Sequence, residues 1–308
     1  MKLSVIVPCY NEELTVEKFY LAATPVLEKI DGMDYEIVFV NDGSADKTAE
    51  KLSSLALRDN RVKVVNFSRN FGQQAAILCG FRSCTGDCAV ELDCDLQDPV
   101  EVVPEMIEKW KEGYQVVHGR RVSRKGETIF KKATAAIYYK KLAKISSVDI
   151  PRNTGDFKLL DRKVIDIIIN LPEHGKYLRG LESWVGFKQT FVDFERKERV
   201  AGETHYTLKK MFNLAKAGVI SNSSYPLSLS LKAGIVGLIL SVLGFIALIV
   251  LTALSVTNDP VWWLFPTVVL LASGVMLCNA ITNLYIEKIY DEVKNRPEYI
   301  VDNKINLD

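Results

Sequence analysis

The sequence has no excess of charge of either sign. Of its 308 residues, 39 are Lys or Arg and 38 are Asp or Glu, so the formal net charge is only +1. A domain that binds nucleic acid through its phosphates carries a clustered basic surface and a strongly basic balance. The composition therefore argues against nucleic acid as a partner.

Paired Cys-x-x-Cys motifs are also missing. The chain has six cysteines, and the four between positions 79 and 94 are close enough in sequence to suggest zinc. They lack the paired spacing of zinc knuckles, and thiols of a cytosolic domain stay reduced. We interpret the cysteines as small buried side chains.

Charged residues are absent from two long stretches near the C-terminus, 233–258 and 260–286, with only Asp259 between them. Each stretch exceeds the roughly 20 residues that a helix needs to cross a bilayer. We predict a hairpin of two transmembrane helices over residues 231–287. Two helices buried in a protein core are the alternative.

Basic residues flank this hairpin on both sides. Lys and Arg near the ends of membrane helices favour the cytoplasmic side. Lys232 precedes the first stretch, and Lys288, Lys294 and Arg296 follow the second. We therefore expect a multi-pass plasma-membrane protein whose N-terminal domain, residues 1–205, and C-terminal tail, residues 288–308, are cytoplasmic. The N-terminus turns polar too early for a signal peptide and is typical of a strand.

Two basic segments, 129–145 and 208–220, have apolar residues at helical spacing and lysines elsewhere on the helix. Such helices lie in the plane of a membrane surface, although a packed helix with a solvated lysine face has the same pattern. We expect residues 206–230 to form an amphipathic interface helix and a linker that leads into the membrane.

Strands and helices alternate four times in the first hundred residues. Apolar strands are expected at 3–7, 35–40, 62–67 and 89–93, which predicts an α/β domain with a mainly parallel sheet. In such sheets, ligands lie beyond the carboxyl ends of the strands. Polar clusters follow each of the four strands, at 10–12, 41–44, 69–73 and 93–98.

Asp93 and Asp95 form the most informative of these clusters. Positions i and i+2 of a strand face the same side, so two carboxylates at a strand end can converge on one hard cation. Asp-x-Asp is also common in solvated loops. The choice between a metal site and a loop depends on the rest of the chain.

Several motifs, in their order and spacing, resemble the polyprenyl-phosphate glycosyltransferases of glycosyltransferase family two, which include bactoprenol glucosyltransferases and dolichol-phosphate mannose synthases. The resemblance covers nearly the whole chain. The motifs that carry it are Ser4 to Glu12, Asn41 to Ser44, Asp93 to Pro99, Gly155 to Phe157, Arg179 to Trp184, Arg199 to Tyr206, and the ending Tyr285 to Tyr290 with Arg296 to Tyr299.

The resemblance implies a Rossmann-like GT-A catalytic domain, a nucleotide-sugar donor and a polyprenyl phosphate acceptor. Mg²⁺ or Mn²⁺ would be held by Asp95 directly, with Asp93 as a second ligand or a nucleotide contact. The cation would stabilise the negative charge of the departing diphosphate. The remaining residues expected to bind the nucleotide sugar are Pro8, Tyr10, Glu12, Asp42 and Arg199.

Two of these residues have ordinary alternatives. Asp42 suits a hydrogen bond to a uracil or ribose, but Asp-Gly-Ser is also typical of a turn. Arg199 can offer a planar fork of donors to phosphates, or it can be a surface arginine. His205 stands where the family usually has lysine, so it either weakens a phosphate contact or is simply exposed.

Asp156 is the catalytic base that the resemblance implies, together with Asp95 as the other catalytic residue. The nucleophile, however, is a phosphate monoester with a second pKa of about 6, so it needs little deprotonation. Asp156 can instead orient the acceptor, hold the metal or take the last proton. Basic residues expected to bind the acceptor phosphate are Arg121, Arg124 and Lys131, which could equally attract anionic lipid head groups.

One in-line displacement at the anomeric carbon predicts inversion of configuration. By family, UDP-glucose is the preferred donor, with UDP-N-acetylglucosamine and GDP-mannose as alternatives. A processive polysaccharide synthase would need more membrane helices, and a non-enzymatic membrane scaffold would not need the acidic motifs. Asn279 and Asn283, one helical turn apart, predict a homo-oligomer joined by hydrogen bonds between spans.

Overall fold

The computed structural model describes residues 1–122, 154–173, 175–195 and 261–307, together with a few single positions between 243 and 253. The chain divides into two compact units. One unit contains residues 1–143, 148–213 and 297–308, and the other contains residues 144–147 and 214–296. The first unit is called the catalytic unit below.

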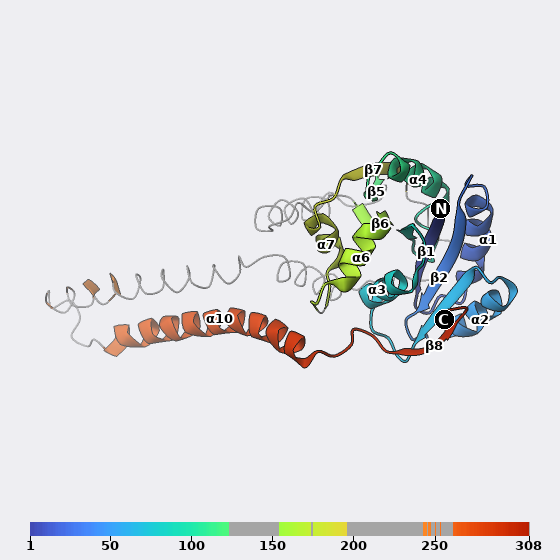
Figure 1. The fold of residues 1–308 in the computed structure, drawn as a ribbon. Helices are drawn as coiled ribbons and strands as arrows, with labels where there is room; N and C mark the ends of the chain where they lie inside the picture. Colours follow the sequence, from blue (N-terminus) through green and yellow to red (C-terminus); the bar gives the residue numbers. More distant parts are fainter. Residues whose placement is uncertain are drawn as a thin grey trace. The chain divides into compact units, whose positions relative to one another are not determined.

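The catalytic unit is built on one sheet, whose eight described strands run in the order β7-β5-β6-β4-β1-β2-β3-β8 (Figure 1). The strands are β1 (Lys2–Cys9), β2 (Asp34–Asn41), β3 (Val62–Phe67), β4 (Cys88–Glu91), β5 (Val116–Arg121), β6 (Thr154–Asp161), β7 (Gln189–Phe194) and β8 (Val301–Ile305).

Seven described helical segments accompany these strands in the same unit. They are α1 (Val16–Leu27), α2 (Thr48–Arg58), α3 (Gln73–Ser83), the short 3-10 helix η1 (Val100–Val102), α4 (Val103–Lys111), α6 (Arg162–Asn170) and α7 (Leu178–Trp184).

Strand pairing is mixed. The strands β3, β2, β1 and β4 are mutually parallel, as the alternation of strands and helices predicts. The strand β6 runs antiparallel to β4 and β5, and β8 runs antiparallel to β3. The strand β7 is parallel to β5. The α/β, Rossmann-like layer and the mainly parallel sheet are thus confirmed, with β6 and β8 as the two described strands that run in the opposite direction.

Side chains alternate along the strands between two hydrophobic cores, one on each face of the sheet. Leu3, Val5 and Val7 of β1 pack with α1, α2 and α4 on one face, whereas Ile6 packs with α3, α6 and α7 on the other. In α3, a Cβ on Gly80 would lie 2.2 Å from Cγ2 of Ile6, so this glycine allows the close approach of helix and strand. The cysteines Cys9, Cys79, Cys84, Cys88 and Cys94 are buried, which confirms their interpretation.

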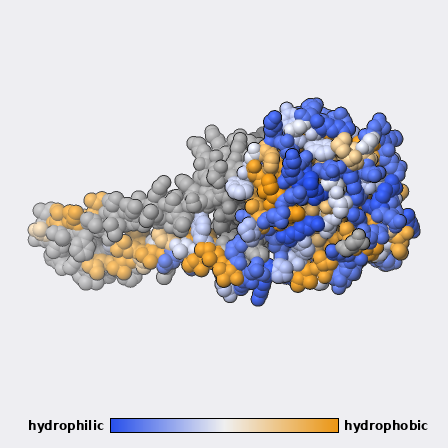
Figure 2. All heavy atoms as spheres, viewed as in Figure 1, coloured by the Kyte–Doolittle hydropathy of each residue, from blue (hydrophilic) through white to orange (hydrophobic). Residues whose placement is uncertain are grey.

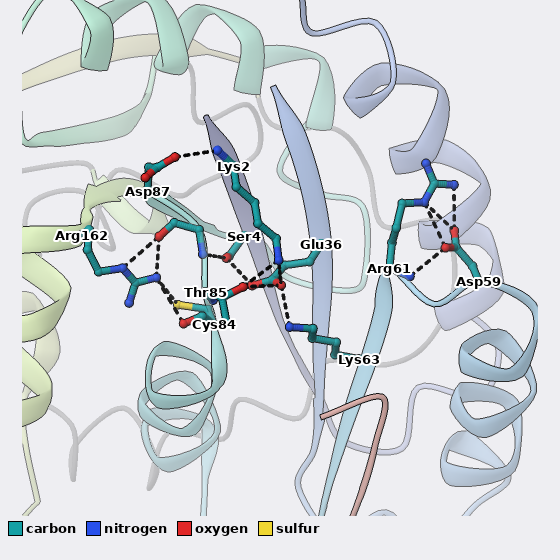
Figure 3. Close-up of polar contacts among 11 residues, drawn as sticks. Lys2, Ser4, Glu36, Asp59, Arg61, Lys63, Cys84, Thr85, Asp87 and Arg162 are labelled. Atoms are coloured by element: carbon teal, nitrogen blue, oxygen red, sulfur yellow. Dashed lines mark hydrogen bonds and ion pairs between the residues drawn. The ribbon is translucent and has the colours of Figure 1, made fainter. Parts of the chain in front are cut away.

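The amino ends of the parallel strands meet around one buried carboxylate, Glu36 of β2 (Figure 3). It accepts hydrogen bonds from Ser4 Oγ at 2.7 Å and from the amide and hydroxyl of Thr85 at 2.6 and 2.9 Å. Lys2 and Lys63 form ion pairs with it at 2.5 and 2.7 Å. These residues, called the Glu36 cluster below, join β1, β2, β3 and the turn before β4.

The C-terminal tail contributes β8, which the sequence analysis did not predict. A row of amides, two buried and one exposed, crosses three strands there: Asn41 Nδ2 donates to Asn66 Oδ1 at 2.8 Å, and Asn66 Nδ2 donates to the exposed Asn303 Oδ1 at 2.7 Å. The ring of Tyr299 stacks on Phe67 with centroids 4.9 Å apart. The last residues of the chain are therefore part of the catalytic sheet.

The second unit contains α10 (Val261–Lys294), a helix of 34 residues that includes the second uncharged stretch. Figure 2 shows hydrophobic side chains gathered along this helix, and Val268, Leu270 and Val275 are among those more than half exposed. Within the described residues, no helix meets the length and hydrophobicity expected of a membrane span. The first predicted stretch lies almost entirely outside the described residues, as do the amphipathic segments 129–145 and 208–220.

Candidate active site

The turn that follows β4 carries the two aspartates of the Asp-x-Asp motif. The strand ends at Glu91, two residues earlier than predicted, so neither Asp93 nor Asp95 lies on it. The Asp95 carboxylate accepts the Gln97 amide at 3.0 Å, and Leu96 has a left-handed φ of 58°. The turn, rather than strand alternation, therefore brings the two carboxylates to the carboxyl edge of the sheet.

Asp93 lies among other carboxylates. Its burial, reinforced by the negative charges of Asp98, Asp156 and Asp95 and opposed by Arg121, raises its pKa to about 7. Gln73 Nε2 donates to Asp93 Oδ1 at 3.1 Å. This concentration of negative charge would be relieved by a bound cation.

The donor set suits a cation that shares its ligands with a substrate. In the described part of the chain, no three Asp, Glu, His or Cys side chains are grouped as a metal site. Magnesium is commonly held by one or two carboxylates together with substrate phosphates. Asp93 and Asp95 fit that arrangement, and carboxylate oxygens are the ligands that Mg²⁺ and Mn²⁺ prefer.

Asp42 is buried at the carboxyl end of β2 and organises the neighbouring loop. Its carboxylate accepts the amides of Phe71 and Gly72 at 2.6 and 2.9 Å and Asn70 Nδ2 at 2.9 Å. The following Gly43 has a φ of 63°, and a Cβ there would lie 2.3 Å from the backbone of Arg69. Asp42 is thus a turn residue as well as a candidate nucleotide contact, and the second role stays a prediction.

The other predicted donor-binding residues of the N-terminal half lie along the same edge. Pro8 is near the end of β1, and Tyr10 and Glu12 follow in the loop before α1. Hydrogen bonds join this loop to the one after β2: the Asn11 amide donates to Ser44 Oγ at 2.9 Å, and the Glu12 amide donates to Thr48 Oγ1 at 2.8 Å. The two loops therefore form one wall.

Asp156 of β6 forms a two-pronged ion pair with Arg179 of α7, with Nε at 2.7 Å and Nη2 at 2.8 Å. Burial alone would raise the pKa of Asp156, but Arg179, Lys158 and Arg121 outweigh it and lower the pKa to about 2. A carboxylate with such a pKa is a weak base. This geometry favours an orienting role over proton abstraction.

Arg121, at the end of β5, reaches into the same cluster. Its Nη2 lies 3.5 Å from Oδ1 of the buried Asp98, and a Cβ on Gly155 would lie 2.7 Å from that Nη2. The Arg121 Nε is buried and has no hydrogen-bond partner among the described residues. A buried donor without a partner is costly, and a bound anion would satisfy it.

The structure thus brings Asp93, Asp95, Asp156 and Arg121 to one edge. The predicted Arg124, Lys131, Arg199 and the variant position His205 lie outside the described residues. Reasoning from sequence missed the roles of Asp98, Gln73 and Arg179, although Asp98 and Arg179 stand within motifs already singled out. It also missed Lys158, whose signal is a lone charge in the apolar run Phe157 to Leu160.

Comparison with known proteins agrees with this site. Residues 4–168 match the family described as Glycosyl transferase family 2. An uncharacterized glycosyltransferase of Bacillus subtilis, YkcC, is 46% identical over 100% of this chain and 95% of its own length. The bactoprenol glucosyl transferase of Shigella phage SfV is 37% identical over 99% of both chains.

Among solved structures, glucosyl-3-phosphoglycerate synthase of Mycobacterium tuberculosis, in complex with Mn²⁺, UDP-glucose and phosphoglyceric acid, is similar over 71% of this chain and 79% of its own. The TM-score is 0.47 at 18% identity, and at that distance nothing about ligands is transferred. The match to the family over more than half of the chain, together with full-length relatives, is decisive: the chain belongs to glycosyl transferase family 2 and is a glycosyltransferase.

Proposed function

We propose that the enzyme transfers a hexose, with UDP-glucose as the preferred donor, to a polyprenyl phosphate and inverts the anomeric configuration. One observation carries the proposal: a pair of carboxylates suited to a divalent cation lies beside Arg121, whose buried Nε–H lacks a described partner. A cation site and a phosphate site side by side are what phosphate-linked sugar transfer requires. The full-length relatives named bactoprenol glucosyl transferases support the acceptor.

Asp95 and Asp93 would hold Mg²⁺ or Mn²⁺ through their carboxylate oxygens. When bound, the cation supplies Lewis-acid stabilisation of negative charge on the nucleotide diphosphate. Pro8, Tyr10, Glu12 and Asp42 form the wall against which the nucleoside would rest.

Arg121 binds the acceptor phosphate and holds one of its oxygens toward the anomeric carbon. The phosphate monoester, with a second pKa of about 6, is mostly ionised at neutral pH and attacks without a base. Asp156, kept ionised by Arg179, accepts hydrogen bonds from the sugar or orients Arg121 instead of removing a proton. In-line attack on a UDP-α-glucose gives a β-linked lipid phosphosugar.

The membrane is the proposed location of the reaction, with the catalytic unit in the cytoplasm. Support comes from the two uncharged stretches and their basic flanks, from the hydrocarbon chain of the proposed acceptor, and from the exposed apolar side chains of α10. Asn279 and Asn283, both exposed on α10, would join neighbouring copies. Unchanged assembly size of the double Asn→Leu variant in detergent would contradict that contact.

The experiment is a donor panel. Membranes containing the protein are incubated with undecaprenyl phosphate, Mn²⁺ and either UDP-glucose, UDP-N-acetylglucosamine or GDP-mannose, and the lipid product is identified by mass spectrometry. A single hexose on undecaprenyl phosphate is expected with UDP-glucose, and NMR should show a β linkage. Asp95→Asn is the inactive control. Absence of any lipid-linked sugar would overturn the proposal, and a polymeric product would indicate a processive synthase.

A further inference from the structure

A row of buried polar side chains crosses the sheet beneath α7. Glu91 of β4, Lys158 of β6 and His118 of β5 are directly opposite one another in the strand register. Glu91 and Lys158 are 1% exposed and His118 is 3% exposed. These positions lie on the face that otherwise packs apolar residues such as Val116 and Leu160, so charged side chains there need an explanation.

The helix α7 supplies the partners of this row. Lys158 Nζ lies 2.6 Å from Oε1 of Glu182 and 3.5 Å from Oε2 of Glu91. Gln189 Nε2 donates to the Glu182 carbonyl oxygen at 3.3 Å, and the Gln189 side-chain oxygen lies 2.9 Å from His118 Nε2. Lys158 and Gln189 thus contact Glu182 directly, and Glu91 and His118 are linked to it through them.

A second ion pair, Asp156 with Arg179, lies next to the first. Asp156 and Lys158 are two residues apart on β6, and Arg179 and Glu182 are three apart on α7, so each pair of neighbours shares a face of its own element. Along β6 the acidic residue precedes the basic one, whereas along α7 the basic residue precedes the acidic one. Moving α7 by one turn would place like charges together, so the two ion pairs specify one position of the helix.

Stability alone does not account for this arrangement. Burial of charges costs free energy, and apolar side chains of similar volume often stabilise a protein as well or better. Burial opposes the charge of Lys158, but Glu182, Glu91 and Asp156 outweigh it and raise the pKa of Lys158, so the lysine stays protonated. The arrangement therefore fixes the position of α7, and with it the position of the Arg179 guanidinium that holds Asp156.

We propose that Lys158 and Glu182 are positioning residues, whose ion pair fixes α7 on β6 and thereby holds Arg179 against Asp156 at the reactive edge. The structural part of the proposal concerns the Arg179–Asp156 contact alone. The kinetic part rests on the proposed function, because it assumes that Asp156 orients a reacting group.

The test replaces both partners by apolar residues of similar size, Lys158→Met with Glu182→Leu, in a protein that also carries Glu91→Gln, so that no buried charge of this row is left unpaired. The matched control is Leu160→Val, which lies two residues farther along the same face of β6. Two quantities are measured in the purified full-length protein: the rate of hexose transfer, and the slowly exchanging Nε–H resonance of Arg179, assigned from an Arg179→Lys variant.

In the double variant, the Arg179 resonance should be lost or exchange rapidly. The kcat should fall about tenfold, with affinity for UDP unchanged within twofold, because the donor wall lies in the loops that follow β1 and β2. The control should retain both. A double variant that keeps the Arg179 resonance overturns the proposal, whether or not its rate falls, and so does one that keeps the wild-type kcat.

A second variant is used if the double variant does not fold. Glu182→Gln keeps the size and the hydrogen-bonding capacity but removes the charge, and the same two measurements then decide. If the wild-type protein transfers no sugar to any polyprenyl phosphate, the proposed function fails, while the Arg179 resonance still decides whether the pair positions α7.

Discussion

Two carboxylates at opposite edges of the same sheet, the buried Glu36 and the half-buried Asp93, have opposite properties. Glu36, at the amino edge, is surrounded by donors: burial would raise its pKa, but Lys2, Lys63, Ser4 and Thr85 lower it to about 2. Asp93, at the carboxyl edge, is surrounded by Asp98, Asp156 and Asp95, and its pKa is raised to about 7.

The difference separates a structural carboxylate from one with a proposed role in the reaction. The Glu36 cluster is complete within the protein and ties strands together (Figure 3). Around Asp93, the carboxylates of Asp98, Asp156 and Asp95 are opposed by Arg121, and the proposed cation would offset their negative charge. Desolvation raises the pKa of both carboxylates, and the charge of their neighbours decides the net direction.

The largest expected effect tests the functional edge. Asp95→Asn and Asp93→Asn should each lower the transfer rate by roughly 10²–10³-fold, as the loss of electrostatic stabilisation in a water-poor site does. Thermal stability should be unchanged or higher, because each variant removes a repelling charge. Rates with saturating Mn²⁺ and melting temperatures measure the two effects. A variant with a lower melting temperature and a wild-type transfer rate would contradict this prediction, because it would give Asp93 or Asp95 a structural role.

The Glu36 cluster should behave the other way. Glu36→Gln should destabilise the fold at pH 7 by about 3 kcal/mol, because the pKa of Glu36 in the folded protein is below the ordinary value. The contribution is present above about pH 4.5 and is lost as the pH falls toward about 2. Urea titrations at pH 7 and pH 3 measure it.

Its control is Arg61→Met, which removes the exposed ion pair with Asp59 drawn in the same figure and should cost less than about 1 kcal/mol. The kcat of the Glu36→Gln protein, measured below its melting temperature, should equal that of the wild type. A lower kcat would mean that the amino edge also takes part in the reaction.

A smaller effect concerns the competition between protons and metal at Asp93. Because its pKa is about 7, a proton occupies the carboxylate below that pH and must leave before a cation binds. Affinity for Mn²⁺ should therefore rise up to about tenfold per unit as the pH approaches 7, and level off above it. Calorimetry from pH 5.5 to 8 measures this, and Asp93→Asn should flatten the curve. A flat wild-type curve would show that Asp93 is not a ligand.

The smallest effect concerns the amide row that joins β8 to the sheet. Asn303→Ala removes the acceptor of Asn66 Nδ2 and should cost about 1 kcal/mol of stability. Lys304→Ala, at the neighbouring exposed position, is the control, because Asp302 accepts a hydrogen bond from Asn303 Nδ2. Equal unfolding curves for the two variants would mean that the amide row does not stabilise the packing of β8 on the sheet.

The parts of the fold that the sequence predicts well are those with uninterrupted apolar strands. β3 was predicted at its observed bounds, and β1 and β2 within two residues at each end. β6 was missed because Asp156 and Lys158 interrupt its apolar pattern, and β8 because only its ends are half-buried. The direction of pairing depends on connections between distant segments, which local pattern does not contain.

For the site, the sequence predicted the residue types but not their partners. Asp93 and Asp95 stand together in sequence, so a shared cation site could be predicted from the motif alone. The ion pair of Asp156 with Arg179 joins residues 23 apart that meet only once β6 and α7 are packed, so the low pKa of Asp156 could not be inferred. Whether an aspartate acts as a base or orients another group depends on which charged side chains lie near it in the fold, and the residue type alone does not tell.

The strand β8 has a consequence for the order of synthesis. Its residues 301–305 are translated after α10, yet they cover the edge of β3 in a sheet whose other described strands lie before residue 195. A nascent chain therefore carries an open sheet edge, a site of unwanted pairing, throughout translation of α10. Completion of this sheet therefore waits until the ribosome has passed residue 305.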